Sequence, residues 1–281
     1  MKFFKKRIFW LSVLIVMIIG VFALKSVSLE QKSEEDLRIE AEEYYKEGDY
    51  SKTIQIYQKI LSQTENKEGA YLDLANTYRY WGKVEESEKM FKKALEINPN
   101  NDWTYTDLGK LYRNMNKYPE AEQSFKKALE INPNNDLAYG YGLGYLYRDM
   151  GNNDEALKMF KRAFEINPSE FNYMGLGDIY REMGNYEESE KMFKKALEID
   201  PNSESYLGLG WLYLEEGKYD LAEKTFKQFL ERIREKGEVY YALAQVYIQE
   251  GRIDDAKGAL KRALELNPDD ELFQQSLQNI N

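Results

Sequence analysis

The feature that most constrains this chain is a sequence that recurs at a nearly fixed interval. The residues FKKALEINPNN occupy positions 91–101 and return unchanged at positions 125–135. Related versions begin at Phe160, Phe193 and Leu260. The first four prolines that belong to this motif stand at positions 99, 133, 168 and 201, so they are 34, 35 and 33 residues apart. A period in the thirties predicts an array of stacked repeats rather than one globular core.

Each period contains two segments with the apolar spacing of an amphipathic helix. In one period Tyr71, Leu74 and Tyr78 recur at helical spacing, and a second helical segment follows from Val84. Between the two segments stands a residue that tolerates the left-handed backbone conformation and can therefore end a helix. These turn residues are Gly48, Gly82, Asn116, Gly151, Gly184, Gly217 and Gly251. The pattern predicts a helix–turn–helix unit.

This arrangement resembles the tetratricopeptide repeat, a helix–turn–helix unit of 34 residues. Aligned on the family pattern, residues 34–270 form seven units that start near residues 34, 68, 102, 137, 170, 203 and 237. The eleventh position is tyrosine in every unit, from Tyr44 to Tyr247. The eighth position is small in every unit: Ala41, Ala75, Gly109, Gly144, Gly177, Gly210 and Ala244. The resemblance implies an all-α, right-handed α-solenoid, with residues 271–281 as a C-terminal capping helix.

Three units depart from the family pattern. The first has Glu40 where a large apolar residue is expected and Ile60 where a small one is expected. The sixth has Phe229 at a small position and no proline, so its second helix is expected to extend toward Lys236. One extra residue stands near Asp136, at the start of the fourth unit.

The composition excludes several classes of function. There are 39 Lys and Arg against 49 Asp and Glu, which gives a formal net charge of −10 and makes nucleic-acid binding a poor expectation. The absence of cysteine and histidine removes thiolate nucleophiles, imidazole acid–base chemistry and the usual zinc sites. The carboxylates alternate with lysines at helical spacing, which favours pairing on the helix surface. We therefore expect no enzymatic activity, no catalytic residues, no bound metal and no cofactor.

The N-terminus has the pattern of a membrane signal. Residues 1–7 carry four cations, and residues 8–24 contain no charge, so that a helix there would span about 25 Å. The positive-inside rule places residues 1–7 in the cytoplasm and the repeats on the extracytoplasmic side. Two outcomes remain open: an uncleaved transmembrane anchor, or a signal peptide whose cleavage yields a secreted or periplasmic protein. Residues 25–33 form a polar spacer in either case.

The resemblance implies that the first helix of each unit lines a concave groove in which family members hold peptides or protein segments. Four successive units have arginine at the same groove position: Arg79, Arg113, Arg148 and Arg181. Aromatic residues share the predicted groove: Trp103, Tyr141, Tyr145, Phe171, Trp211 and Tyr241. Such a mixture of Arg, Trp and Tyr is typical of binding hot spots. Two interpretations of the arginines stay open, contact with the carboxylates of a ligand or neutralisation of neighbouring acids such as Asp149, Asp178 and Glu182.

Two functions follow from these patterns. The first is a membrane-tethered, non-catalytic scaffold that binds partner proteins or extended peptides in the groove. The second is a binding protein for an acidic polysaccharide or another envelope polymer, secreted if the signal is cleaved. End-to-end association with a second copy is also compatible with a repeat array.

Overall fold

The structure of this protein is a computed structural model that describes residues 32–232 and 235–280. These residues form α-helices and one π-helix, and no strand occurs among them. The elements are α2 (Glu34–Glu47), α3 (Tyr50–Gln63), α4 (Lys67–Tyr80), α5 (Val84–Ile97), α6 (Asp102–Asn114), α7 (Tyr118–Ile131), η1 (Ala138–Gly144), α8 (Tyr145–Asp149), α9 (Asn153–Ile166), α10 (Glu170–Glu182), α11 (Tyr186–Ile199), α12 (Ser205–Glu215), α13 (Tyr219–Arg232), α14 (Gly237–Gln249), α15 (Ile253–Leu266) and α16 (Glu271–Asn279). The predicted all-α solenoid class is confirmed.

The predicted membrane segment, residues 8–24, lies outside the described residues. Within residues 32–232 and 235–280, no helix combines the length and apolar character that a membrane crossing needs.

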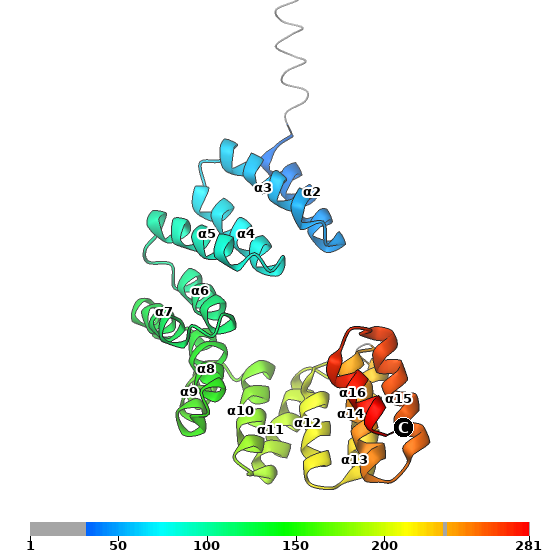
Figure 1. Ribbon diagram of the computed structural model, residues 1–281. Helices are drawn as coiled ribbons and strands as arrows, with labels where there is room; N and C mark the ends of the chain where they lie inside the picture. Colours follow the sequence, from blue (N-terminus) through cyan, green and yellow to red (C-terminus); the bar gives the residue numbers. More distant parts are fainter. Residues whose placement is uncertain (1–31, 233–234, 281) are drawn as a thin grey trace, which may run out of the picture. The chain divides into compact units, whose positions relative to one another are not determined.

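The chain divides into two compact units, Met1–Asn100 and Asn101–Asn281. The described part of the first unit consists of the hairpins α2–α3 and α4–α5. The second unit consists of α6–α7, η1–α8–α9, α10–α11, α12–α13 and α14–α15, followed by α16. Within this second unit, first helices of consecutive repeats contact one another, as α6 does with η1 and α10 with α12. Figure 1 shows α6, α8, α10 and α12 along the inner side of the curve of this unit, with α7, α9 and α11 along its outer side.

The turns between the two helices of a repeat have the predicted left-handed geometry. All six predicted glycines have φ between 71° and 79°, and Asn116 has φ of 57°. At Gly82 the backbone N–H donates to the Arg79 carbonyl at 3.1 Å, which closes the end of α4. Since side chains other than Asn rarely adopt this conformation, the turn residues are explained by the backbone alone.

A phenylalanine from five of the second helices, α5, α7, α9, α11 and α13, forms the centre of the packing between repeats. Phe193 is completely buried and lies against Gly177 of its own repeat and Gly208 of the next one. A Cβ atom built on Gly177 would lie 2.8 Å from the Phe193 ring, so glycine is needed for this close approach. The equivalent phenylalanines are also fully buried: Phe91, Phe125, Phe160 and Phe226.

The asparagine of the INP sequence closes the second, third and fourth repeats with a hydrogen bond to an acid. Asn98 Nδ2 donates to Glu68 Oε1 at 3.0 Å, and Asn132 Nδ2 donates to Asp102 Oδ2 at 2.8 Å. The fifth repeat has Asp200 in this place, which cannot donate, and there Glu170 accepts from the Ser203 hydroxyl instead. The recurring sequence is therefore structural, because it supplies the buried phenylalanine and this closing contact.

Two of the three departures have a visible outcome. The extra residue near Asp136 is accommodated as the π-helix η1, whose wider turn takes up one more residue between fixed ends. The sixth second helix is expected to extend toward Lys236; α13 is described as far as Arg232, residues 233–234 lie outside the described residues, and Glu235 and Lys236 are not helical. Phe229 is nevertheless completely buried, with Lys236 Nζ 5.5 Å from its ring centroid.

Candidate functional site

Within the unit Asn101–Asn281, three arginines occupy the last turn of consecutive first helices. Arg113 lies on α6, Arg148 on α8 and Arg181 on α10. A cation in the last turn is favoured by the negative end of the helix dipole. Because the three residues have the same place in their repeats, they lie on equivalent faces of the three helices.

Each of these arginines reaches a carboxylate that belongs to the following repeat. Arg113 Nε is 3.5 Å from Asp149 Oδ2, Arg148 Nε is 3.8 Å from Glu182 Oε1, and Arg181 pairs with Glu215. We call these three arginines and three acids the ion-pair ladder. The ladder shows that the arginines do neutralise neighbouring acids, and that they do so across the boundaries between repeats.

Asp178 is a fourth acid beside the ladder. Its carboxylate is 3.9 Å from Arg148 Nη1, and its side chain is only 20% exposed. Burial raises the pKa of Asp178 to about 6, although the guanidinium groups of Arg181 and Arg148 act in the opposite direction and Glu182 adds to the rise. The ionised Asp178 carboxylate therefore destabilises the folded state at neutral pH.

Aromatic rings cover the guanidinium groups at the middle of the ladder. Arg148 lies 4.6 Å from the ring centroid of Tyr145, and Arg113 lies 5.5 Å from the same ring. Tyr145 meets Tyr141 edge to face, with 5.3 Å between the ring centroids. Burial raises the pKa of the Tyr145 hydroxyl, so this tyrosine is neutral at physiological pH. Arg113 and Arg148 thus both lie close to the Tyr145 ring.

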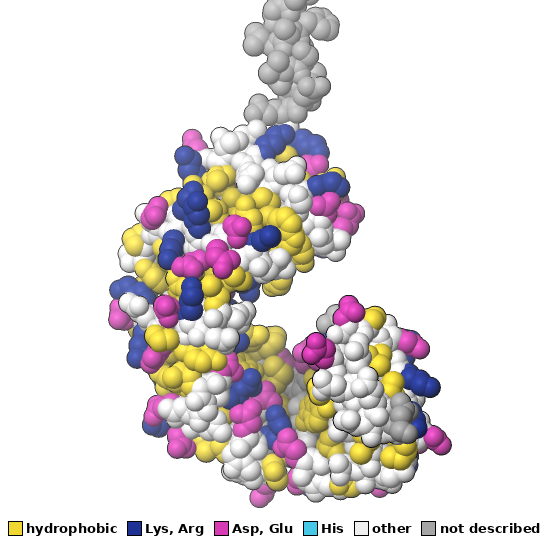
Figure 2. All heavy atoms as spheres, viewed as in Figure 1, with side chains coloured by type: hydrophobic (Ala, Val, Ile, Leu, Met, Phe, Trp, Pro, Cys, Tyr) yellow, Lys and Arg dark blue, Asp and Glu magenta, His cyan; other side chains and the backbone are white. Residues whose placement is uncertain are grey.

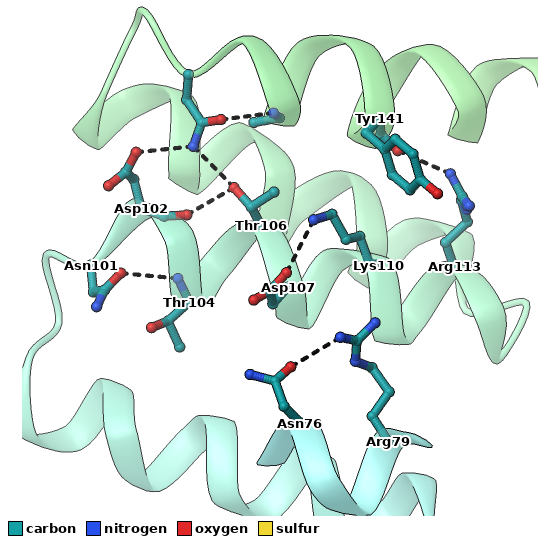
Figure 3. Close-up of polar contacts among 12 residues, drawn as sticks. Asn76, Arg79, Asn101, Asp102, Thr104, Thr106, Asp107, Lys110, Arg113 and Tyr141 are labelled. Carbon is teal, nitrogen blue, oxygen red and sulfur yellow. Dashed lines mark hydrogen bonds and ion pairs between the residues drawn. The ribbon is translucent and has the colours of Figure 1, made fainter. Parts of the chain in front are cut away.

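The π-helix supplies an additional acceptor to this cluster. Arg113 Nη1 donates to the Tyr141 carbonyl at 3.0 Å, as Figure 3 shows. On the same helix as Arg113, Lys110 pairs with Asp107 at 3.1 Å and lies 5.4 Å from the Tyr141 ring. Tyr141 therefore contributes both its backbone and its ring to the position of the cations.

The structure separates the predicted groove aromatics into two groups. Trp103 and Phe171 are each 58% exposed and Tyr141 is 42% exposed, so that their rings are available to a ligand. Trp211 instead meets Phe226 edge to face, with 5.8 Å between the centroids. Tyr241 stacks on Phe273 of α16 at 5.2 Å, so the C-terminal helix occupies one face of its ring.

The fourth predicted arginine, Arg79, belongs to the unit Met1–Asn100 and has different partners. Its Nη2 donates to Asn76 Oδ1 at 3.0 Å, a contact drawn in Figure 3. Its guanidinium lies 4.7 Å from the Tyr80 ring centroid. No ion pair of Arg79 occurs among the described residues.

Two contributors to the ladder were not predicted from the sequence. Glu215 pairs with Arg181, and the Tyr141 carbonyl accepts from Arg113. The sequence does contain a signal for the first, because Asp149, Glu182 and Glu215 each follow the groove position of their repeat directly. A backbone acceptor released by a π-helix has no comparable sequence signal.

Figure 2 shows apolar side chains along the inner surface of the unit Asn101–Asn281, with basic and acidic side chains next to one another among them. The three arginines of the ladder are paired with its three acids. The ladder therefore contains no unpaired acid or base and no nucleophile. This surface is suited to binding an extended, partly apolar segment.

Comparison with known proteins identifies the family. The sequence matches the tetratricopeptide repeat at residues 69–101 and 103–135, at residues 136–202 and 169–235, and at residues 213–280. The chain belongs to the tetratricopeptide repeat family. Proteins of this family are generally non-catalytic scaffolds that bind protein or peptide partners, and no enzyme family was detected.

Solved structures agree with this fold. A tetratricopeptide repeat protein from Parabacteroides merdae is 20% identical, with a TM-score of 0.71 over 88% of this chain and 98% of that chain. A thermophilic tetratricopeptide repeat protein from Thermus thermophilus is 26% identical, with a TM-score of 0.57 over 64% of this chain and 98% of that chain. PilW, a type IV pilus biogenesis factor, is 17% identical, with a TM-score of 0.66 over 77% of this chain and 99% of that chain. No curated protein matches the sequence significantly.

Proposed function

We propose that this protein is a membrane-tethered, non-catalytic scaffold that binds an extended segment of a partner protein along its first helices. The observation that carries the proposal is the exposure of Trp103, Tyr141 and Phe171 on three consecutive first helices of one unit. Large aromatic side chains are the residues most enriched in binding hot spots, and their exposure on a free surface is unfavourable. A partner segment that covers them would remove this apolar area from water.

The ion-pair ladder supports the binding of a segment with mixed polar and apolar side chains. Each arginine of the ladder already has a carboxylate partner, but a guanidinium carries five N–H donors and the ladder uses only some of them. The remaining donors suit the backbone carbonyls of an extended segment. Pairing also keeps the surface near neutrality, so apolar contacts would contribute most of the affinity.

The proposed tether is residues 8–24, and the proposed location of the repeats is the extracytoplasmic side. The support is the uncharged run of 17 residues behind four N-terminal cations. Release into the periplasm or medium after cleavage is the alternative. In the test, a protease is added to intact cells from outside. We expect it to degrade the repeats, and degradation that requires lysis of the membrane would refute the proposed sidedness.

An acidic polymer is the less favoured ligand. A polyanion needs unpaired cations, whereas three of the four predicted groove arginines already have acidic partners. Binding to such a polymer would weaken steeply with salt. Salt-insensitive capture of partner proteins therefore distinguishes the two functions.

The scaffold function is tested by removing the exposed aromatic rings from the first helices. Trp103→Ala and Phe171→Ala are combined in the full chain, and partners are captured from membrane and secreted extracts and quantified by mass spectrometry. We expect the loss of the proteins that the unchanged chain enriches. The matched control is Ile199→Ala, because Ile199 is 53% exposed but lies on a second helix. Identical capture by the double variant and the control would refute the proposal.

A further inference from the structure

Arg79 differs from the other three groove arginines because it alone among them has no ion pair with a described residue. Among the described residues it makes one hydrogen bond, to Asn76, and no ion pair. Its Nε is buried and has no hydrogen-bond partner. Four of its five N–H donors are therefore unused, in a side chain that retains a full positive charge. A guanidinium in this state has the capacity to bind an anion.

The reason for the missing partner is visible in the repeat sequences. In the ladder, each arginine takes the acid that directly follows the groove position in the next repeat. In the repeat that follows Arg79, the residue at this place is Asn114 and not an acid. The repeat after Arg79 therefore has no acid at the sequence position from which the ladder arginines take their partners.

The residues next to Arg79 are aromatic and basic. Tyr80 is 57% exposed and lies against the Arg79 guanidinium, and Trp81 is 43% exposed. Lys83 Nζ lies 5.5 Å from the Trp81 ring centroid and has no ion pair among the described residues. We call these four residues, Arg79, Tyr80, Trp81 and Lys83, the α4–α5 patch. It holds two unpaired cations in a chain whose net charge is −10.

The aromatic neighbour of Tyr80 adds no negative charge to the patch, whereas Glu85 and Glu86 follow Lys83 in the first turn of α5. Tyr45 of α2 meets Tyr80 edge to face at 5.6 Å. Burial raises the pKa of Tyr45 to about 12, and the neighbouring Tyr80 and Tyr50 add to the rise. Within the same unit, Asp73 is paired with Arg38, and Glu42 is paired with Lys46 at 3.8 Å. These acids therefore have cations of their own.

We propose that the α4–α5 patch binds the carboxylate of an aspartate or glutamate in an extended peptide, with an adjacent apolar side chain of that peptide against Tyr80 and Trp81. This inference rests on the proposed scaffold function and assigns a chemistry to one part of it. The unused Nη donors of Arg79 form charge-assisted hydrogen bonds with the carboxylate, and Lys83 adds a second positive charge. The exposed rings provide apolar area next to the charged contact.

The test is selection of peptides from a random dodecapeptide library displayed on phage. The full chain, Arg79→Gln and the matched control Arg162→Gln are used as targets under the same conditions. Arg162 is a suitable control because it is paired with Glu165 and lies on the second helix α9, outside the groove positions. Circular dichroism of each variant checks that the helical content is unchanged.

We expect peptides selected on the unchanged chain and on Arg162→Gln to share an acidic residue beside a large apolar one. Selection on Arg79→Gln should lose this acidic preference. A synthetic selected peptide should bind Arg79→Gln at least tenfold more weakly, and its Glu→Gln version should show a similar loss with the unchanged chain. The proposal is overturned if no acidic preference emerges, or if Arg79→Gln selects the same peptides.

A separate arm distinguishes an anionic lipid surface from a peptide. Vesicles of phosphatidylcholine with or without phosphatidylserine are sedimented with the full chain and with Arg79→Gln. Binding to phosphatidylserine that depends on Arg79, without acidic peptides in the selection, would overturn the peptide assignment. Failure of the scaffold function has a different signature, because the Trp103→Ala and Phe171→Ala variant would then retain its protein partners.

Discussion

Replacing Gly208 with alanine should destabilise the repeat array, even though alanine is the better helix former. Gly208 lies on α12, and its missing side chain faces the ring of Phe193 from the preceding repeat. A Cβ atom at Gly208 would lie 2.5 Å from Phe193 Cζ. The ring has no free direction of movement, since Phe193 is completely buried and Gly177 also lies against it.

The magnitude follows from two opposing terms. Overpacking of a tightly packed core costs about 1–3 kcal/mol, and the confined Phe193 ring places Gly208→Ala at the upper end. The gain in helix propensity from Gly to Ala is about 1 kcal/mol. The net expectation is a loss of about 2 kcal/mol in the free energy of unfolding.

The chain offers a matched control in Gly258. This residue is also a helical glycine, on α15, but no atom lies within 4 Å of a Cβ built there. Gly258→Ala should therefore stabilise the protein by about 0.5–1 kcal/mol. Urea unfolding followed by circular dichroism measures both variants. Hydrogen exchange of the α11 and α12 amides shows whether the loss at Gly208 is local, as expected when neighbouring repeats contribute the stability.

A double-mutant cycle tests the assigned cause. Phe193→Leu replaces the ring with a smaller apolar side chain. In the last repeat the equivalent buried position is already occupied by a leucine, the fully buried Leu260. Gly208→Ala should cost less in the Phe193→Leu background than in the unchanged chain. If Gly208→Ala raises stability as Gly258→Ala does, or if the cost is the same in both backgrounds, the steric explanation is refuted.

Two further substitutions test the electrostatic interpretation. Asp178→Asn should raise the free energy of unfolding at pH 7.5 by about 1–3 kcal/mol and have little effect at pH 4, because a shift of one pKa unit corresponds to about 1.4 kcal/mol. The sign follows from the raised pKa of Asp178, about 6 against 3.8: between these values the folded state holds a proton that the unfolded state has lost, so stability falls as pH rises through this window. Thermal unfolding at several pH values measures the effect, and an equal effect at pH 4 and 7.5 would contradict it. Asp200→Asn should stabilise the fifth repeat by about 0.5–1 kcal/mol, because it restores the donor that the equivalent Asn132 supplies to Asp102. A lower melting temperature of Asp200→Asn at pH 7 would show that the hydrogen bond to Glu170 does not form.

The fold could be predicted because it is specified locally and repeatedly. Each unit carries its own turn residue and its own small residue at the helix crossing, and five of the seven carry their own buried phenylalanine. Gly82 and Asn116 illustrate the point, since the positive φ of each is explained by residue type alone. A departure from the repeat pattern in one unit leaves the other units recognisable.

The candidate site was less predictable, because its contacts cross from one repeat to the next. Equal sequence positions predicted equal roles for four arginines, yet Arg148 lies among acids, whereas Arg79 has no ion pair with a described residue. Tyr241 shows the same limit, because its ring is occupied by Phe273 of the terminal helix. Partner choice depends on which side chains face each other across a repeat boundary, and the helical pattern of one unit contains no such information.

The π-helix η1 has a consequence for how such arrays change in length. One residue added to an α-helix rotates every later side chain by about 100°, since 3.6 residues make one turn. Here the added residue is confined to Ala138–Gly144, and α8 continues with Arg148 next to Tyr145 and facing Asp178. The directions in which the later side chains of this helix point are therefore not changed by the added residue. A repeat protein with such a segment can gain or lose a residue on its binding surface while all downstream repeats keep their orientation.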